Sequence, residues 1–162
     1  MKILILGDLI GNSGRKALQE NLSKIIEERS IDFTILNGEN AAEDGKGITK
    51  NITDELFKLG VDVITSGNHI WDKKETSEFI TKEERLLRPE NLAAGSPGNG
   101  FGIFLSKNNS TKTSLAALTI IEVDCPRLRH LFIIFVEGNL FEFTLWNSIL
   151  FKVLLLILLS FL

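Results

Sequence analysis

Three short apolar segments of this sequence each end in a glycine that is followed at once by a side chain able to bind a metal ion. The three groups are Gly7-Asp8, Gly38-Glu39-Asn40 and Gly67-Asn68-His69. Carboxylate and amide oxygens and imidazole nitrogens are hard to borderline donors, which suit Mn, Fe, Zn or Mg better than metals that prefer thiolates. Two such ions about 3.5–4 Å apart can hold a phosphoryl group and activate a bridging water. The pattern therefore indicates a metal-dependent site that cleaves phosphoesters.

Strands alternating with helices are expected to position these side chains. Three apolar segments have the length of buried strands, and each ends just before one of the groups: Lys2–Gly7, Asp32–Asn37 and Val61–Thr65. Repeated strand-helix-strand units favour an α/β fold with parallel strands and helical cover. Such sheets bind ligands beyond the carboxyl ends of their strands. We therefore expect one edge of the sheet to gather all five metal-capable side chains: Asp8, Glu39, Asn40, Asn68 and His69.

Two segments have the signals of helices packed against that sheet. Arg15–Arg29 is expected to follow a glycine-bearing loop, Leu9–Gly14, and its apolar spacing places four side chains on one face: Leu18, Leu22, Ile25 and Ile26. Thr49 is expected to cap a second helix that runs to Leu59, and Gly60 to end it.

The next segment is charged and is expected to form an exposed helix over Lys73–Glu84, stopped by Arg88-Pro89. Lys73 and Lys74 are expected to be solvated side chains at the start of this helix. Phe79 and Ile80 are its apolar anchors. Further strands are expected later in the chain: Phe101–Ser106, Leu115–Val123 and Leu131–Val136.

Length and composition limit the classes of protein to consider. A chain of 162 residues fits one domain with a sizeable core. The net charge of −3 gives no general attraction to nucleic acid or anionic lipid, so no stable nucleic-acid binding is expected. The single cysteine, Cys125, excludes an internal disulfide and favours a reducing compartment. The apolar start of the chain is too short for a signal peptide, and a cytoplasmic location is expected.

A set of motifs, in this order, resembles the bacterial YmdB-like branch of the calcineurin-like metallophosphoesterases: Gly7-Asp8, Asn37–Ala42, Gly45–Thr49, Gly67–Lys74, Leu86–Pro89 with Asn91, and Gly95–Gly98. The resemblance covers roughly residues 1–105. It implies the N-terminal part of a four-layer αββα metallophosphoesterase sandwich. It also implies hydrolysis of phosphodiesters, cyclic nucleotides among them, at a two-metal centre.

The resemblance implies a role for each residue that matches a motif. Asp8 would hold one metal ion, and Glu39 would bridge both. Asn40 and Asn68 would bind the second ion. His69 would protonate the leaving oxygen as a general acid. The expected cofactors are two divalent ions, with Fe or Mn favoured and Zn or Mg as alternatives, and the expected partner is a small phosphodiester or cyclic nucleotide substrate.

The same residues also allow structural interpretations. Asp8 could cap the turn after its strand, and Glu39-Asn40 and Asn68-His69 could form hydrogen-bonded polar turns. Asp72 is expected to orient its loop rather than to bind metal. Arg88 could bind a substrate phosphate or form an ion pair that stabilises the fold.

The second part of the chain departs from the family pattern. The family contributes further histidine ligands there, including a His-x-His motif, whereas this chain has two histidines in all, His69 and His130. We therefore expect residues 1–126 to form an incomplete metallophosphoesterase domain and residues 127–162 an apolar tail outside the family pattern. The hypothesis is a truncated or frameshifted product with impaired phosphodiesterase activity.

The C-terminal end raises an alternative to the enzyme. Between Leu145 and Leu162 four residues interrupt an apolar run: Asn147, Ser148, Lys152 and Ser160. This length is at the lower limit for spanning a bilayer, and the lysine would be costly at its centre. The alternative is a non-catalytic remnant that contacts the membrane through residues 145–162. The sequence does not fix the oligomeric state.

Overall fold

A computed structural model describes residues 2–105, 115–125 and 128–138 of the chain. The apolar segment 145–162, proposed above as a membrane contact, lies outside the described residues. Within them, no helix combines the length and the apolar character needed to cross a bilayer.

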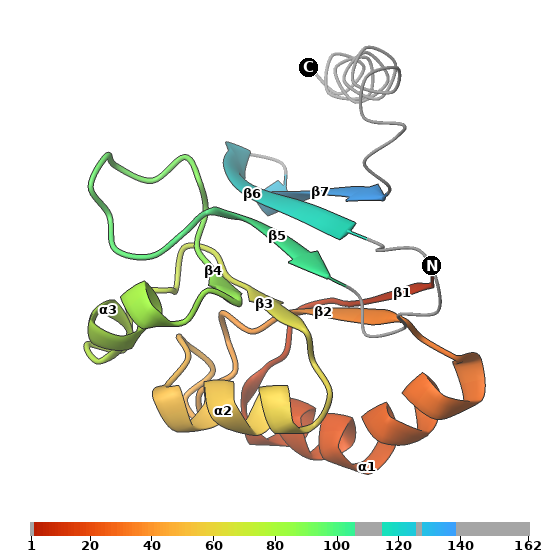
Figure 1. The fold of residues 1–162 in the computed structure, drawn as a ribbon. Helices are drawn as coiled ribbons and strands as arrows, with labels where there is room; N and C mark the ends of the chain where they lie inside the picture. The colour runs from red at the N-terminus through yellow and green to blue at the C-terminus, as the bar shows by residue number, and fades with distance from the viewer. Residues whose placement is uncertain (1, 106–114, 126–127, 139–162) are drawn as a thin grey trace.

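Three layers make up the described part of the chain (Figure 1). The middle layer is a parallel sheet with the strand order β1 (Ile3–Leu6), β2 (Phe33–Asn37), β3 (Val63–Thr65) and β4 (Leu86–Leu87). Helices lie on one side of it: α1 (Gly11–Arg29), α2 (Lys50–Lys58), the short α3 (Thr76–Phe79) and the 3-10 turn η1 (Ile80–Lys82). On its other side lies an antiparallel sheet of β5 (Phe101–Leu105), β6 (Leu115–Cys125) and β7 (Leu128–Gly138).

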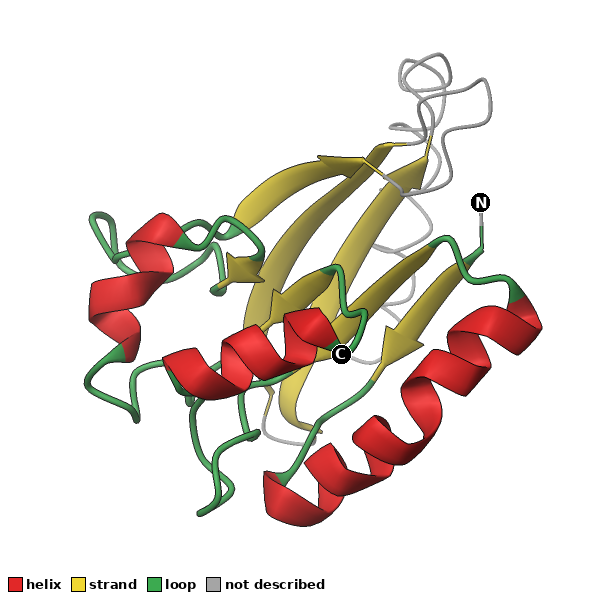
Figure 2. Ribbon diagram, turned by 60° about the horizontal axis from the view of Figure 1, so that its bottom comes forward, coloured by secondary structure: helices red, strands yellow, loops and turns green. Residues whose placement is uncertain are grey.

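This arrangement confirms the predicted α/β fold with a parallel sheet. The two sheets and one helical layer are the first three layers of the expected αββα sandwich. α1 and α2 run side by side across one face of the parallel sheet (Figure 2). The strands predicted over Phe101–Ser106, Leu115–Val123 and Leu131–Val136 correspond to β5, β6 and β7, with small differences in their ends.

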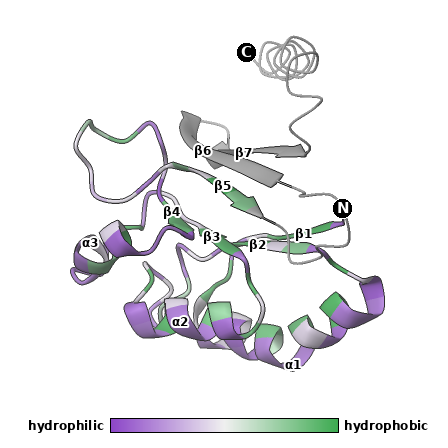
Figure 3. Cartoon of the chain, viewed as in Figure 1, coloured by the Kyte–Doolittle hydropathy of each residue, from purple (hydrophilic) through white to green (hydrophobic). Residues whose placement is uncertain are grey.

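The central strand β2 is buried along its whole length because both of its faces are covered. On the face toward the second sheet, Phe33 and Ile35 pack with Val63 and Leu87. On the opposite face the core includes the next side chain along, Leu36, packed among residues from the helices. This alternation is the period-two pattern of a strand that is covered on both sides. The hydropathy colouring shows the consequence: the coloured strands are mostly apolar, whereas α1 and α2 carry polar residues on their outer faces (Figure 3).

The first helix begins earlier than predicted. α1 starts at Gly11, so the loop expected over Leu9–Gly14 is wrong for the last four of its six residues. Gly11 and Gly14 are poor helix formers, which is why the sequence suggested a loop. The Gly11 N–H donates to the carbonyl oxygen of Asn40 at 2.9 Å, and this tertiary hydrogen bond holds the start of the helix against the site. At the start of α1 this tertiary contact outweighs the low helix propensity of glycine.

The second helix follows the prediction closely. Thr49 is the N-cap of α2, and its side chain accepts a hydrogen bond from the Ile52 N–H at 3.3 Å. Such a cap stabilises a helix by about 1 kcal/mol. Leu59 ends the helix, and Gly60 then takes a φ of 109°, in the region that favours glycine. This confirms the helix termination predicted at Gly60.

The helix predicted over Lys73–Glu84 is wrong. The structure has only α3 and η1 in this segment, because residues before Thr76 form turns held by long-range contacts. The Thr76 hydroxyl donates to the carbonyl oxygen of Ile48 at 2.8 Å, and this contact fixes where the helix begins. The strand β4 was not predicted. Its two leucines are fully buried and pair with β3, but two residues are too short to show a pattern in the sequence.

We predict that the two central positions of α1 differ sharply in their contribution to stability. Leu22 is 1% exposed, whereas Ile25, expected on the same buried face, is 37% exposed. Leu22→Ala should lower the free energy of unfolding by about 2–5 kcal/mol because it leaves a cavity. Ile25→Ala should lower it by less than about 1 kcal/mol. Urea denaturation of both variants tests this; equal losses would contradict the position of α1 on the sheet.

Candidate metal centre

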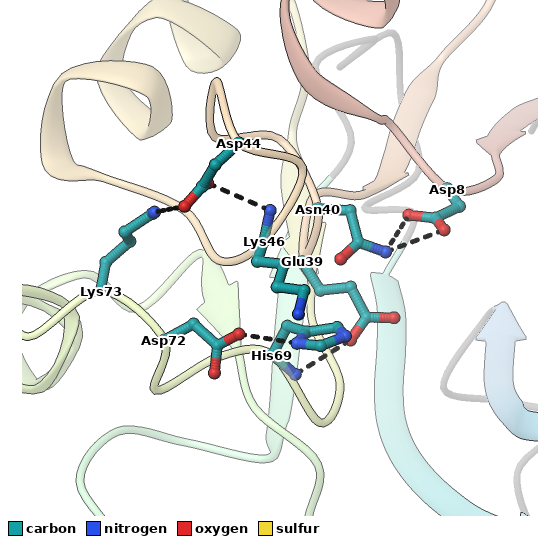
Figure 4. A network of polar contacts seen from close by, with 8 residues as sticks. All are labelled: Asp8, Glu39, Asn40, Asp44, Lys46, His69, Asp72 and Lys73. Carbon is teal, nitrogen blue, oxygen red and sulfur yellow. Dashed lines mark hydrogen bonds and ion pairs between the residues drawn. The ribbon is translucent and has the colours of Figure 1, made fainter.

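The carboxyl ends of the first three parallel strands meet at one edge of the sheet, where four of the predicted site residues come together (Figure 4). Asp8 follows β1, Glu39 and Asn40 follow β2, and His69 follows β3. The N–H of Gly38 donates to the carbonyl oxygen of Thr65 at 2.9 Å and keeps the ends of β2 and β3 in register. The sheet therefore brings residues far apart in the sequence to a common edge, as the sequence predicted.

Asp8 and Asn40 are joined by a hydrogen-bonded contact between two strand ends. The Asn40 Nδ2 donates to both carboxylate oxygens of Asp8, at 3.0 Å and 2.9 Å. Asp8 is exposed and Asn40 is half-buried. The amide oxygen of Asn40 points away from Asp8 (Figure 4). This pairing holds two oxygen-bearing side chains at the same place without consuming the amide oxygen of Asn40.

Glu39 supplies a carboxylate that is almost completely withdrawn from water. The residue is 3% exposed, and its Oε2 accepts a hydrogen bond from the backbone N–H of His69 at 3.4 Å. Its own N–H donates to the side-chain oxygen of Asn37 at 3.1 Å. A buried carboxylate is costly unless it is hydrogen-bonded or paired with positive charge. A divalent cation beside it would supply such a charge.

His69 is held by the residue three positions later. The imidazole Nδ1 lies 2.8 Å from Oδ2 of Asp72. The carboxylate accepts the Nδ1 proton in this arrangement, which leaves Nε2 as the ring nitrogen available for chemistry. Asp72 therefore orients the histidine ring itself.

A loop over residues 41–47 closes one side of the site. Its Asp44 accepts a hydrogen bond from the Lys73 ammonium at 2.6 Å, and this contact holds the pKa of the Asp44 carboxyl below its usual range. Lys73 is only 24% exposed. The expectation that Lys73 is a solvated side chain at the start of a helix is therefore wrong, because its ammonium is paired with Asp44. The two residues are 29 positions apart, so no local sequence pattern predicts this contact.

Gly47 lets this loop pack tightly against the turn that carries His69. Its φ is 77°, and a Cβ there would lie 2.9 Å from Cγ of Lys73 and 3.3 Å from the carbonyl oxygen of His69. The glycine that precedes Glu39 has a different role. A Cβ on Gly38 would lie 2.9 Å from Cγ2 of Ile64, so glycine is needed there for the residue after β2 to pack closely against β3.

Two of the predicted site residues stand apart from this network. Asn68 is exposed in the same turn that carries His69. The guanidinium of Arg88 donates to the carbonyl oxygens of Pro89 at 2.7 Å and Pro97 at 3.2 Å, and it lies 3.6 Å from the Glu90 carboxylate. These contacts tie down the loop before β5. A substrate-binding role for Arg88 stays a prediction.

The donor set contains oxygen ligands of the kind that a divalent ion needs. Asp8, Glu39 and the amide oxygens of Asn40 and Asn68 are the hard oxygen donors that such ions prefer. Over the described ranges, however, no group of three or more His, Cys, Asp or Glu side chains is placed to hold a metal. The chemistry of the donors thus fits a divalent ion, and their number requires the amide oxygens or donors from elsewhere.

Comparison with known proteins shows the family of this chain. A sequence model described as YmdB-like protein matches residues 4–136, and the chain belongs to this family. A 2′,3′-cyclic-nucleotide 2′-phosphodiesterase from Bacillus subtilis is 47% identical over 100 residues, which cover 62% of this chain and 38% of that protein.

Two solved structures share the fold. A novel phosphatase from Mycoplasma pneumoniae superposes with a TM-score of 0.64 at 30% identity, over 74% of this chain and 42% of that one. A hypothetical protein from Thermus thermophilus superposes with a TM-score of 0.60 at 36% identity, over 65% of this chain and 42% of that one. The chain therefore spans less than half of the length of these relatives.

We predict that Gly47→Ala loosens the loop over residues 41–47 more than the backbone conformation alone explains. Gly95 is a matched control, because it also has a positive φ, 85°, but a Cβ there would meet nothing within 4 Å. Gly95→Ala should cost about 1 kcal/mol in free energy of unfolding from backbone strain. Gly47→Ala should cost at least about 1 kcal/mol more because the methyl group also collides with Lys73. Equal losses in thermal denaturation would contradict the tight contact.

Proposed function

We propose that this chain carries part of a metal-dependent phosphodiesterase site whose substrates are small phosphodiesters, cyclic nucleotides among them. The observation that carries the proposal is the meeting of Asp8, Glu39, Asn40 and His69 at one sheet edge. The Bacillus subtilis relative, named as a 2′,3′-cyclic-nucleotide 2′-phosphodiesterase, supports the substrate class. A cytoplasmic location stays a prediction.

Four residues would hold two divalent ions. Asp8 would bind one ion, Glu39 would bridge both, and Asn40 and Asn68 would bind the second through their amide oxygens. The donors are oxygens with no thiolate, which suits hard divalent ions. The family resemblance favours Fe or Mn, with Zn or Mg as alternatives. When bound, such ions polarise the phosphoryl group and generate a nucleophilic hydroxide from water. Asn40 already holds its oxygen away from Asp8, so it can serve an ion without breaking that contact.

His69 would act as the general acid of the reaction. Addition of water to phosphorus breaks one P–O ester bond, and the departing alkoxide needs a proton. With Asp72 holding Nδ1, protonated Nε2 can deliver that proton. The products are a phosphomonoester and an alcohol, which remain one molecule when the substrate is a cyclic diester.

A second candidate is a non-catalytic remnant that binds metal weakly. It is favoured by the lack of three converging acidic or imidazole groups in the described part of the chain. An ion held by few ligands is bound weakly, because each missing donor leaves a coordination position to water. Metal stoichiometry separates the two candidates.

The first test of the proposed function is the loss of metal in Asp8→Asn. Calorimetric titration with Mn²⁺ should show at least about a ten-fold weaker site in the variant, because an anionic ligand is replaced by a neutral one. Hydrolysis of a 2′,3′-cyclic nucleotide should fall below detection. The matched control is Glu84→Gln, which removes an exposed carboxylate away from the site. Turnover that survives Asp8→Asn would point to a contaminant and would contradict the proposal.

The second test separates a general acid from a metal ligand. His69→Asn should lower kcat by about 10²–10⁴-fold while Mn²⁺ affinity stays close to that of the unchanged chain. Asp72→Asn should lower kcat less, by about ten-fold, because the ring remains but loses its orienting carboxylate. If His69→Asn instead abolishes Mn²⁺ binding with a small effect on kcat, the histidine is a ligand and its assignment as an acid is wrong.

A further inference from the structure

Lys46 is the one basic residue of the loop over residues 41–47, and the proposed mechanism does not use it. It stands between two glycines in the left-handed region, Gly45 with a φ of 75° and Gly47 with a φ of 77°. The loop is closed by backbone hydrogen bonds, from Gly45 N–H to the Ala42 oxygen at 2.8 Å and from Ala42 N–H to the Gly47 oxygen at 2.9 Å. The backbone around Lys46 is therefore tightly constrained.

Side-chain contacts fix the same loop to the site. Asp44 accepts the backbone N–H of Lys46 at 3.3 Å and the ammonium of Lys73 at 2.6 Å. Gly47 packs against the carbonyl oxygen of His69, so Lys46 stands next to the turn that carries the proposed general acid. Figure 4 shows the Lys46 side chain directed toward Glu39 and His69.

Three cations near the site are already engaged. Lys73 pairs with Asp44, Lys50 pairs with Asp54, and Arg88 donates to backbone carbonyl oxygens. The Lys46 side chain, in contrast, is exposed, and none of the described residues forms a hydrogen bond or ion pair with its ammonium. A cation that is presented by a constrained loop and faces a site for anionic substrates is placed to bind an anion.

We propose that Lys46 is a substrate-positioning residue whose ammonium binds a non-bridging oxygen of the substrate phosphodiester on the His69 side. The inference rests on the proposed function, because it takes the phosphodiester as the ligand. A lysine ammonium is a compact point charge with three donors, so it can hold a phosphate oxygen without a fixed fork geometry. Its contact orients the ester oxygen toward His69 and stabilises the bound substrate.

The test is a titration of the whole chain with dimethyl phosphate in the presence of Mg²⁺, followed by the backbone amide signals of Gly45, Lys46 and Gly47 in ¹H–¹⁵N NMR spectra. The unchanged chain should show saturable shifts. Lys46→Met should raise the apparent Kd by about ten-fold, the effect of one partly exposed charge-assisted hydrogen bond. Lys46→Arg should keep the Kd within about three-fold because it keeps the charge. A parallel titration with inorganic phosphate distinguishes a site for phosphodiesters from a site for free phosphate.

Lys58→Met is the matched control, because Lys58 is exposed at the far end of α2 and its loss changes the net charge equally. Its Kd should stay within about two-fold at physiological salt, where distant charges are screened. The proposal is overturned if the unchanged chain shows no saturable shift at the loop, if Lys46→Met binds as before, or if Lys58→Met weakens binding as much. Tighter Lys46-dependent binding of inorganic phosphate than of the diester would also overturn it, in favour of a free-phosphate site.

In a turnover assay of the metal-loaded chain, Lys46→Met should raise KM and leave kcat within about two-fold, as expected for binding common to ground and transition states. A fall in kcat with unchanged KM would contradict the positioning role. The outcome is independent of the metal test: if Asp8→Asn binds Mn²⁺ normally, the proposed function fails, while Lys46-dependent binding of dimethyl phosphate can still be seen. If Lys46 has no effect and Asp8→Asn loses Mn²⁺, only the further inference fails.

Discussion

The burial of the Glu39 carboxylate is the constraint on which the rest of this site depends. A residue that is 3% exposed can keep a charged oxygen only where hydrogen bonds or a cation offset the lost hydration. The His69 N–H supplies one such bond, so the turn after β3 must come close to the end of β2. That approach in turn requires Gly47, since a side chain at this position would separate the loop over residues 41–47 from the turn. One buried charge thus sets the geometry of three loops.

The parallel sheet makes this geometry possible because it places the ends of β1, β2 and β3 at the same edge. Strand β2 is covered on both faces and buried along its whole length, and the two residues with the most central proposed roles, Glu39 and Asn40, follow it. Asp8 and His69 come from the flanking strands and are held to the centre by hydrogen bonds. The proposed site residues thereby lie on loops, and the positions of these loops are set by a packed core.

The parts of this structure that could be predicted from the sequence are those with a local signal. The three strands that carry the site, the Thr49 cap and the gathering of Asp8, Glu39, Asn40 and His69 all follow from apolar runs, capping residues and the rule for strand ends. The start of α1 and the broken helix after Lys73 could not be predicted, because Asn40 and Ile48 fix them from distant parts of the chain. The ion pair between Asp44 and Lys73 is hidden for the same reason.

The parallel register also determines how the molecule must fold. Ile3 pairs with Phe33 and Ile35 pairs with Val63, so the paired residues lie 30 and 28 positions apart in the sequence, and a helical crossover connects each pair of strands. No hairpin within the parallel sheet can nucleate it, and chain entropy must be lost before any of its ladders forms. The oxygen donors therefore meet only after both crossovers have closed. A cation that needs all of these donors would bind only the chain whose parallel sheet is complete. Its binding energy would therefore add directly to the free energy of folding.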